Sequence, residues 1–123
     1  MRLLLDSVIV IDHLNGIPAA GAYLREHTEE AAISVITRAE VLAGFPSEET
    51  AAPAAALLDR FPLLAIDGAV ADSAARLRRE VRWKLPDAFQ AALAQRHGLT
   101  LVTRNTRDFP PERHTFVHVP YRV

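Results

Sequence analysis

Short blocks of Leu, Ile and Val alternate along the chain with longer stretches of mixed polarity. The blocks are typical of buried strands and lie at 2–5, 31–35, 62–66, 99–103 and 115–119. The stretches between them predict helices, at 8–14, 18–27, 37–45, 47–61, 68–84 and 87–98. Strands that alternate with helices predict an α/β fold, with a mostly parallel central sheet of four to five strands that helices cover on both faces.

Residues that favour helix ends mark several of these boundaries. Ser47 is a typical N-cap, and Gly98 is typical of the position just after a helix. Pro86 separates the fifth predicted helix from the sixth, since proline interrupts a helix interior. A chain of 123 residues is long enough for one hydrophobic core but not for two, and it shows no repeat or linker. We therefore expect a single domain over residues 1–123.

Composition narrows the class of protein. The chain has no cysteine, which excludes disulfides and thiolate metal sites and favours a reducing cytoplasm. Asp6 and Asp12 interrupt the apolar N-terminal stretch, which argues against a signal peptide, and no apolar run has the length of a membrane span. The formal net charge of −1 does not indicate a nucleic-acid binder. Of the 14 basic residues only Lys84 is lysine, a bias that phosphate binding and a GC-rich genome explain equally well.

Carboxylates occur where the predicted strands end. Asp6 ends the first strand, Glu40 lies near the start of the helix after the second, and Asp108 follows the fourth. Ligands of an open parallel sheet bind beyond the carboxyl ends of its strands, so we expect these three side chains to lie close together. Asp87 joins them if its helix runs antiparallel to the strand that follows it.

Each carboxylate also has an ordinary structural explanation. Segments 37–40 and 87–90 both fit a capping box, with Thr37 and Asp87 as N-caps. Asp6 or Ser7 fits the N-cap of the first helix, and Asp108 fits a turn. However, several carboxylates that converge without a cation repel one another. Ligands that are all oxygens favour Mg²⁺ or Mn²⁺ over zinc.

Three segments make the chain resemble the PIN-domain ribonucleases, specifically the VapC-type toxins of bacterial toxin–antitoxin pairs. They are LLLDSVIVIDHL at 3–14, SVITRAEVLAG at 34–44 and LPDAFQAALAQRHGLTLVTRNTRDF at 85–109. The resemblance implies a PIN-like three-layer sandwich and a metal-dependent endoribonuclease, in which metal-activated water hydrolyses RNA and leaves a 5′-phosphate and a 3′-hydroxyl.

The resemblance also implies which residues form the site. Asp6, Glu40 and Asp87 match the three acids that hold the metal, and the fourth position falls on Asn105 or Asp108, of which Asp108 is favoured. A second ion near Asp108 would stabilise the leaving oxygen.

Further residues match supporting positions of the family. Ser7 and Thr103 match small hydroxyl positions near the site, and Asn105 would hold a metal-bound water or orient the phosphate. Many relatives carry Asn or Ser shortly after the first acid, where this chain has apolar residues at 8–9, so we expect one fewer hydrogen bond orienting that acid.

Partners follow from the same resemblance. Arg104 and Arg107 neighbour the acids and are candidate contacts for the RNA phosphates. VapC-type toxins form homodimers that a small VapB-like antitoxin neutralises. Tyr23, Leu24 and the Ala-rich segment 50–58 are candidates for the antitoxin groove, together with Ile17, although core packing explains them nearly as well.

Other functions have less support. The five histidines show no spacing that pairs one with another or with a nucleophile, so histidine general-base chemistry is not indicated. A non-catalytic PIN-like module that binds RNA or a protein would be expected to lose its acids first. A receiver-like phosphotransfer domain would need a lysine at the end of a late strand, and the only lysine is Lys84.

Overall fold

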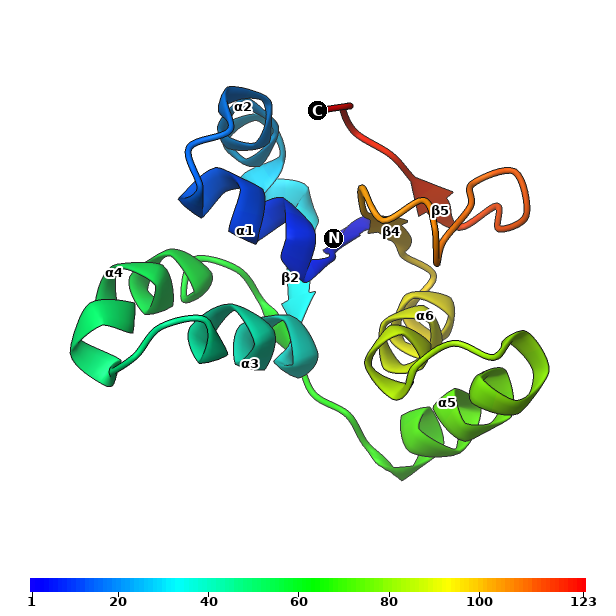
Figure 1. Cartoon of the computed structure of the whole chain (residues 1–123). Helices are drawn as coiled ribbons and strands as arrows, with labels where there is room; N and C mark the ends of the chain where they lie inside the picture. Colours follow the sequence, from blue (N-terminus) through cyan, green and yellow to red (C-terminus); the bar gives the residue numbers. More distant parts are fainter.

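The computed structural model describes residues 1–123 and contains one five-stranded parallel sheet, with strand order β3-β2-β1-β4-β5 (Figure 1). The strands are β1 (Leu3–Leu5), β2 (Ala31–Ser34), β3 (Leu63–Leu64), β4 (Thr100–Val102) and β5 (Val117–His118). The helices are α1 (Ser7–Leu14), α2 (Pro18–His27), a 3-10 turn (Thr28–Glu30), α3 (Val35–Ala43), α4 (Glu48–Leu58), α5 (Gly68–Val81) and α6 (Leu85–His97). The α/β class and the strand order along the chain are as predicted.

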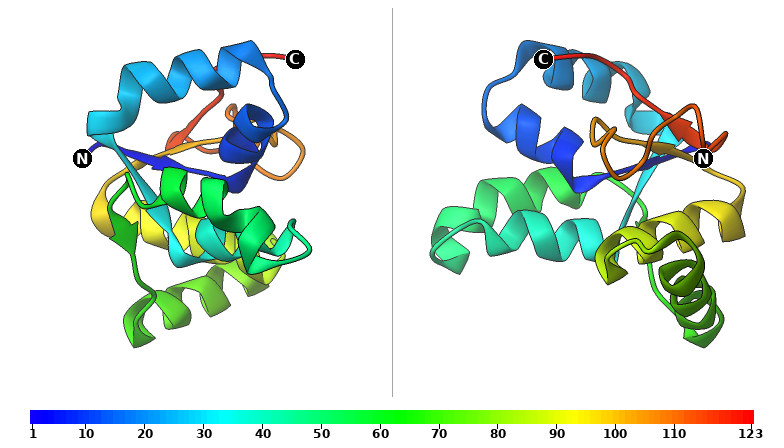
Figure 2. Two further views of the ribbon diagram at one scale, coloured as in Figure 1. Left: turned by 90° about the vertical axis from the view of Figure 1, so that its left-hand side faces the viewer. Right: turned by 45° about the vertical axis from the view of Figure 1, so that its right-hand side comes forward.

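Two hydrophobic cores lie on the two faces of the sheet. Successive side chains of a strand point to opposite faces, so Leu4 packs with α5 and α6 while Leu3 and Leu5 pack with α1 to α4. In β4, Leu101 and Val102 divide between the two cores in the same way. The two groups of helices therefore enclose the sheet as the outer layers of the predicted three-layer sandwich (Figure 2).

The start of α3 differs from the prediction. Ser34 is its N-cap, and the hydroxyl oxygen Oγ of Ser34 accepts a hydrogen bond from the backbone N–H of Thr37 at 3.0 Å. The predicted capping box with Thr37 as N-cap is therefore wrong, and Glu40 lies in the second turn of the helix rather than the first. Both residue types are good caps; Ser34 prevails because it ends β2, where the chain is still extended.

The start of α6 also differs from the prediction. The helix begins at Leu85, with Pro86 in the first turn, where the missing N–H costs no hydrogen bond. Asp87 is therefore a first-turn residue and not the N-cap, and the predicted box at 87–90 does not form. The preceding helix ends at Val81 instead of residue 84, because Arg82 adopts the left-handed conformation (φ 68°) and turns the chain toward α6.

Hydrogen bonding between the central strands continues one residue past their ends. The backbone N–H of Asp6 donates to the carbonyl of Val102 at 2.9 Å, and that of Thr103 donates to the carbonyl of His118 at 3.1 Å. Asp6 and Thr103 thus stand at the carboxyl end of the sheet, with backbones fixed by the sheet itself. None of the helices combines the length and the apolar character that crossing a membrane requires.

Candidate active site

Asp6 is held by three donors although only 6% of the residue is exposed. Its Oδ1 accepts from the backbone N–H of Ser7 at 3.0 Å and from Nε2 of Gln90 at 3.1 Å, and its Oδ2 accepts from the hydroxyl of Thr103 at 2.7 Å. Asp6, rather than Ser7, is therefore the N-cap of α1. Both carboxylate oxygens are satisfied, so the apolar residues at 8–9 do not leave Asp6 without orientation.

Gln90 connects the segments that surround Asp6. The side chain of Gln90 is 1% exposed, and its Nε2 also donates to the hydroxyl of Thr37 at 2.8 Å. Its Oε1 accepts from the hydroxyl of Ser34 at 2.6 Å. The hydroxyl of Thr37 in turn donates to the carbonyl of Leu5 at 3.1 Å. A neutral network thus joins β1, β2, α3 and α6 beneath the candidate site.

The sequence interpretation did not give Gln90 this role. The available signal was an amide three residues after Asp87, on the same helix face, within an alanine-rich stretch that is otherwise apolar. A buried amide is costly unless it is hydrogen-bonded, which points to a specific partner.

Asp87 lies close enough to the other acids for their negative charges to change its pKa. Burial, followed by the negative charges of Asp6, Asp108 and Glu40, raises the pKa of Asp87 from 3.8 to about 6, and nearby Lys84 opposes this. Asp6, Glu40 and Asp108 are therefore near enough to Asp87 to act on its pKa, because the N-terminus of α6 lies at the carboxyl end of the sheet. We call Asp6, Glu40, Asp87 and Asp108 the acidic cluster.

Glu40 shows the same effect more weakly. Loss of solvent around its carboxyl group raises the pKa of Glu40, and the charge of Asp6 adds to this, while an interaction with the side chain of Ser7 lowers it. Ser7 therefore contacts Asp6 through its backbone N–H and lowers the pKa of Glu40 through its side chain.

Asn105 and Asp108, the two candidates for the fourth position of the site, are hydrogen-bonded to each other. Nδ2 of Asn105 donates to Oδ2 of Asp108 at 2.9 Å, and the backbone N–H of Asp108 donates back to Oδ1 of Asn105 at 3.3 Å. The indole N–H of Trp83 donates to the carbonyl of Asp108 at 2.6 Å. Asp108 therefore supplies the negative charge at the fourth position, and hydrogen bonds from Asn105 and Trp83 orient Asp108.

The model of the PIN domain family matches residues 3–110. The chain belongs to the PIN-domain family. A solved structure described as a toxin–antitoxin complex from Klebsiella pneumoniae is similar at 35% identity and a TM-score of 0.89, over 99% of this chain and 100% of that one. FitAcB from Neisseria gonorrhoeae is similar at 25% identity and a TM-score of 0.81, over 99% and 100% of the two chains.

A third similar structure, VapBC-1 from nontypeable Haemophilus influenzae, has 19% identity and a TM-score of 0.78, over 99% of this chain and 100% of that one, and shows the shared fold. No curated protein matches the chain in sequence. The resemblance to the PIN-domain family seen in the sequence is therefore confirmed.

The donor chemistry of this PIN domain fits a hard divalent cation. The acidic cluster offers only carboxylate oxygens, and burial together with the charges of the neighbouring acids raises the pKa of Asp87, so a bound cation would favour its charged form. No group of three or more His, Cys, Asp or Glu side chains is arranged to hold a metal ion as the side chains stand. Holding a cation would thus require side-chain rotation within the cluster, which the partly exposed Glu40 and Asp87 can make most easily.

Of the two arginines predicted to contact phosphate, Arg107 is exposed to solvent and the side chain of Arg104 is 34% exposed. Arg104 instead pairs with the buried Asp12, from Nε to Oδ2 at 2.8 Å and from Nη2 to Oδ1 at 2.7 Å. Its guanidinium fork is therefore engaged within the protein. Asp12 is a second buried acid whose role the sequence did not reveal.

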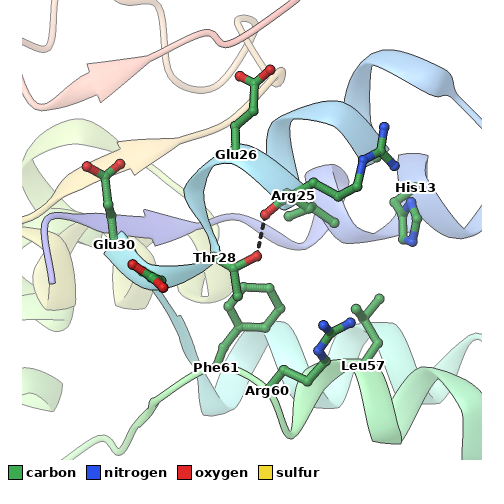
Figure 3. A pocket seen from close by; sticks show the side chains of 11 residues that line it. His13, Arg25, Glu26, Thr28, Glu30, Leu57, Arg60 and Phe61 are labelled. Atoms are coloured by element: carbon green, nitrogen blue, oxygen red, sulfur yellow. Dashed lines mark hydrogen bonds between the residues drawn. The ribbon is translucent and has the colours of Figure 1, made fainter.

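A cavity of about 720 Å³ lies between α2, the 3-10 turn and the end of α4, and no member of the acidic cluster lines it (Figure 3). His13, Arg25, Glu26 and Arg60 contribute charged or polar side chains to its wall. Leu24, which we placed in an antitoxin groove, is 6% exposed and belongs to the core. The acidic cluster of this PIN domain therefore lies apart from the cavity.

Proposed function

We propose that this PIN domain is a metal-dependent endoribonuclease and the toxin of a type II toxin–antitoxin system, neutralised by a cognate antitoxin. The acidic cluster carries the proposal, because carboxylates from four separate segments meet at the carboxyl end of the sheet. The similar structures described as a toxin–antitoxin complex and as FitAcB support the antitoxin part.

Asp6, Glu40 and Asp87 would hold Mg²⁺ or Mn²⁺, with Asp108 as the fourth acid. When bound, such an ion neutralises charge on the scissile phosphate and lowers the pKa of the water that attacks it. Asp6 is the fixed member of the set, because both of its oxygens are already oriented by hydrogen bonds. This division between one fixed and several adjustable carboxylates keeps the position of the site constant.

Asp87 makes the site sensitive to pH. With a pKa of about 6, its carboxyl group is half protonated near pH 6 and becomes a charged oxygen donor above it. Arg107, exposed on the loop next to Asp108, is the proposed contact for RNA phosphates. The Asn105 side chain keeps Asp108 directed toward the cluster.

Cleavage of a mixture of total tRNA and rRNA by the purified protein tests the proposal. Mn²⁺ or Mg²⁺ is added or chelated, and wild type is compared with Asp87→Asn and with the control Glu30→Gln, which alters a surface ion pair to Arg2 at the amino end of the sheet. We expect metal-dependent cleavage by wild type and Glu30→Gln, and loss of at least about 100-fold in Asp87→Asn.

The same experiment decides against the proposal if folded wild type binds RNA and does not cut it with either metal. The chain would then be the alternative, a non-catalytic PIN-like module that binds RNA or a protein.

The partner assignments need separate experiments. We propose a homodimer that a VapB-like antitoxin binds, and a cytoplasmic location is expected for such a pair. Light scattering on the purified protein tests the homodimer, with a mass of twice 13.5 kDa as the expected result. Co-expression with a candidate VapB-like antitoxin, followed by the cleavage assay, tests the antitoxin assignment: the complex should be inactive.

A further inference from the structure

A second polar network lies beside the acidic cluster and involves none of its members. It centres on Asp12, which is 3% exposed and accepts both hydrogen bonds of the Arg104 fork, at 2.8 and 2.7 Å. The phenol of Tyr121 donates to Oδ2 of Asp12 at 2.8 Å. These contacts hold the pKa of Asp12 below its usual value, chiefly through the Arg104 hydrogen bond, and raise that of Tyr121 through burial and its bond to Asp12.

The network joins three segments that are distant in sequence. Asp12 lies in α1, Arg104 follows β4, and Tyr121 lies in the C-terminal segment, which runs from β5 back toward α1 and α2 (Figures 1 and 2). A bidentate arginine–carboxylate pair has a fixed geometry as well as strength, and its partial burial limits screening by solvent. Arg104 is therefore a fastening point for the loop that follows β4.

The loop after β4 is fastened to α1 at two points by consecutive residues. Thr103 bonds to Asp6 at the beginning of α1, and Arg104 bonds to Asp12 near its end. Asp12 lies six positions after Asp6, a distance of about 9 Å along the helix axis. Two attachments this far apart fix the direction of the loop as well as its position.

The residues that follow Thr103 and Arg104 in the chain belong to the candidate site. The backbone N–H of Asn105 donates to the hydroxyl of Thr103 at 3.0 Å, and the side chain of Asn105 holds Asp108. The backbone N–H of Phe109 returns to the carbonyl of Asn105 at 3.0 Å. The direction of the loop at Arg104 therefore determines where the Asp108 carboxylate points.

We propose that Asp12, Arg104 and Tyr121 are positioning residues that set the segment 103–109 so that Asp108 reaches the acidic cluster. The inference rests on the proposed function. It assigns the Arg104 guanidinium to the ion pair with Asp12, which leaves Arg107 as the loop arginine that contacts phosphate.

Asp12→Asn is the decisive variant, because it removes a charge that holds Arg104 and no group that contacts RNA. Mn²⁺ affinity is measured by electron paramagnetic resonance, RNA affinity by filter binding at several salt concentrations, and cleavage by kcat and KM. We expect Asp12→Asn to lose about 10–100-fold in Mn²⁺ affinity or in kcat, as outer partners of metal ligands do, with RNA affinity and KM within about twofold.

Arg107→Gln is the matched control on the same loop. We expect loss of one phosphate contact to weaken RNA binding with Mn²⁺ affinity unchanged. The slope of log RNA affinity against log salt concentration should fall by about one. Tyr121→Phe removes a single hydroxyl, so it should alter Mn²⁺ affinity in the same direction as Asp12→Asn but less. It also serves as the second variant if Asp12→Asn does not fold.

The opposite assignment gives opposite results. If Arg104 contacts phosphate, Asp12→Asn releases the guanidinium and RNA binding tightens with Mn²⁺ affinity unchanged; that result overturns the proposal. Hydrogen exchange of the amides of 104–109, measured without RNA, should quicken in Asp12→Asn and Tyr121→Phe. Unchanged exchange in both also overturns it. Because this readout needs no cleavage, a wild type that never cuts disproves the proposed function and leaves the positioning role to be decided separately.

Discussion

We expect charged Asp87 to destabilise the metal-free protein, because burial and the neighbouring acids both disfavour its charged form. Its pKa rises from 3.8 to about 6. A shift of roughly 2 units corresponds to about 3 kcal/mol of destabilisation of the charged folded state. Partial exposure of the side chain and the favourable position of a charged residue in the first turn of α6 reduce this to about 1–2 kcal/mol. Asp87→Asn should therefore stabilise the metal-free protein.

The sign of the pH dependence follows from which state binds the proton more tightly. The folded state holds the Asp87 proton up to about pH 6, whereas the unfolded chain releases it near 3.8. Wild-type stability attributable to Asp87 therefore falls as pH rises between about 4 and 6 and is constant above about 7. The advantage of Asp87→Asn should be nearly absent at pH 4 and complete at pH 7.5.

Thermal unfolding followed by circular dichroism at pH 4 and pH 7.5 measures this difference. In EDTA at pH 7.5 the variant should melt about 3–8 °C above wild type, given the usual unfolding entropy of a domain of this size. Glu112→Gln, which removes an exposed carboxylate from the loop before β5, controls for net charge and should leave the melting temperature unchanged. Added Mg²⁺ or Mn²⁺ should reverse the order, since only wild type retains the full set of ligands.

The reasoning is refuted if Asp87→Asn is less stable than wild type at pH 7.5 in EDTA. It is also refuted if the difference between them is the same at both pH values. Either result would mean that burial and the neighbouring carboxylates together do not appreciably disfavour the charged form of Asp87, and the electrostatic argument for a metal there would be lost.

Three further predictions concern the groups around the cluster and one helix end. Gln90→Ala should cost about 2–4 kcal/mol in urea unfolding, because it leaves a cavity and removes a donor from buried Asp6; a loss below 1 kcal/mol would show that the network is dispensable. Trp83, the only tryptophan, should lose fluorescence on titration with Mn²⁺, because its indole N–H bonds to the carbonyl of Asp108; constant emission while Mn²⁺ binds would place the ion elsewhere. Gly98→Ala should cost about 1 kcal/mol by thermal unfolding, from its positive φ of 63° alone, since no other group lies within 4 Å of the added carbon; an unchanged melting temperature would contradict this.

Most of the fold was predictable because its signals are local. Alternating apolar blocks specify the strands, and residues such as Ser47 and Gly98 specify helix ends through bonds to neighbours in the chain. The starts of α3 and α6 were not predictable in this way. In α3, Ser34 and Thr37 are both suitable caps, and the choice depends on where β2 ends, which is decided by the pairing of Ser34 with Leu64 in β3.

In the candidate site, too, some features could be predicted from the sequence and others could not. The convergence of its four acids was predictable, because the carboxyl ends of parallel strands meet at one edge. The groups that orient them were not, because their partners are remote: Gln90 lies 84 residues from Asp6, and Arg104 lies 92 residues from Asp12. Arginine next to the acids is typical of both a phosphate contact and an internal ion pair, and only the position of α1 distinguishes the two.

The network around Gln90 and the network around Asp12 have different roles beside the acidic cluster. Additional cations near Asp6 would orient it but would compete with a metal for its charge. Gln90 and Thr103 instead orient it with neutral donors, which leave the negative charge available. The one strong ion pair, Asp12 with Arg104, is internally neutral and lies beside the cluster, so it fastens the loop without changing the net charge of the site. At neutral pH a bound cation would recover the stability that the charged acids lose, and this couples metal binding to a more stable fold.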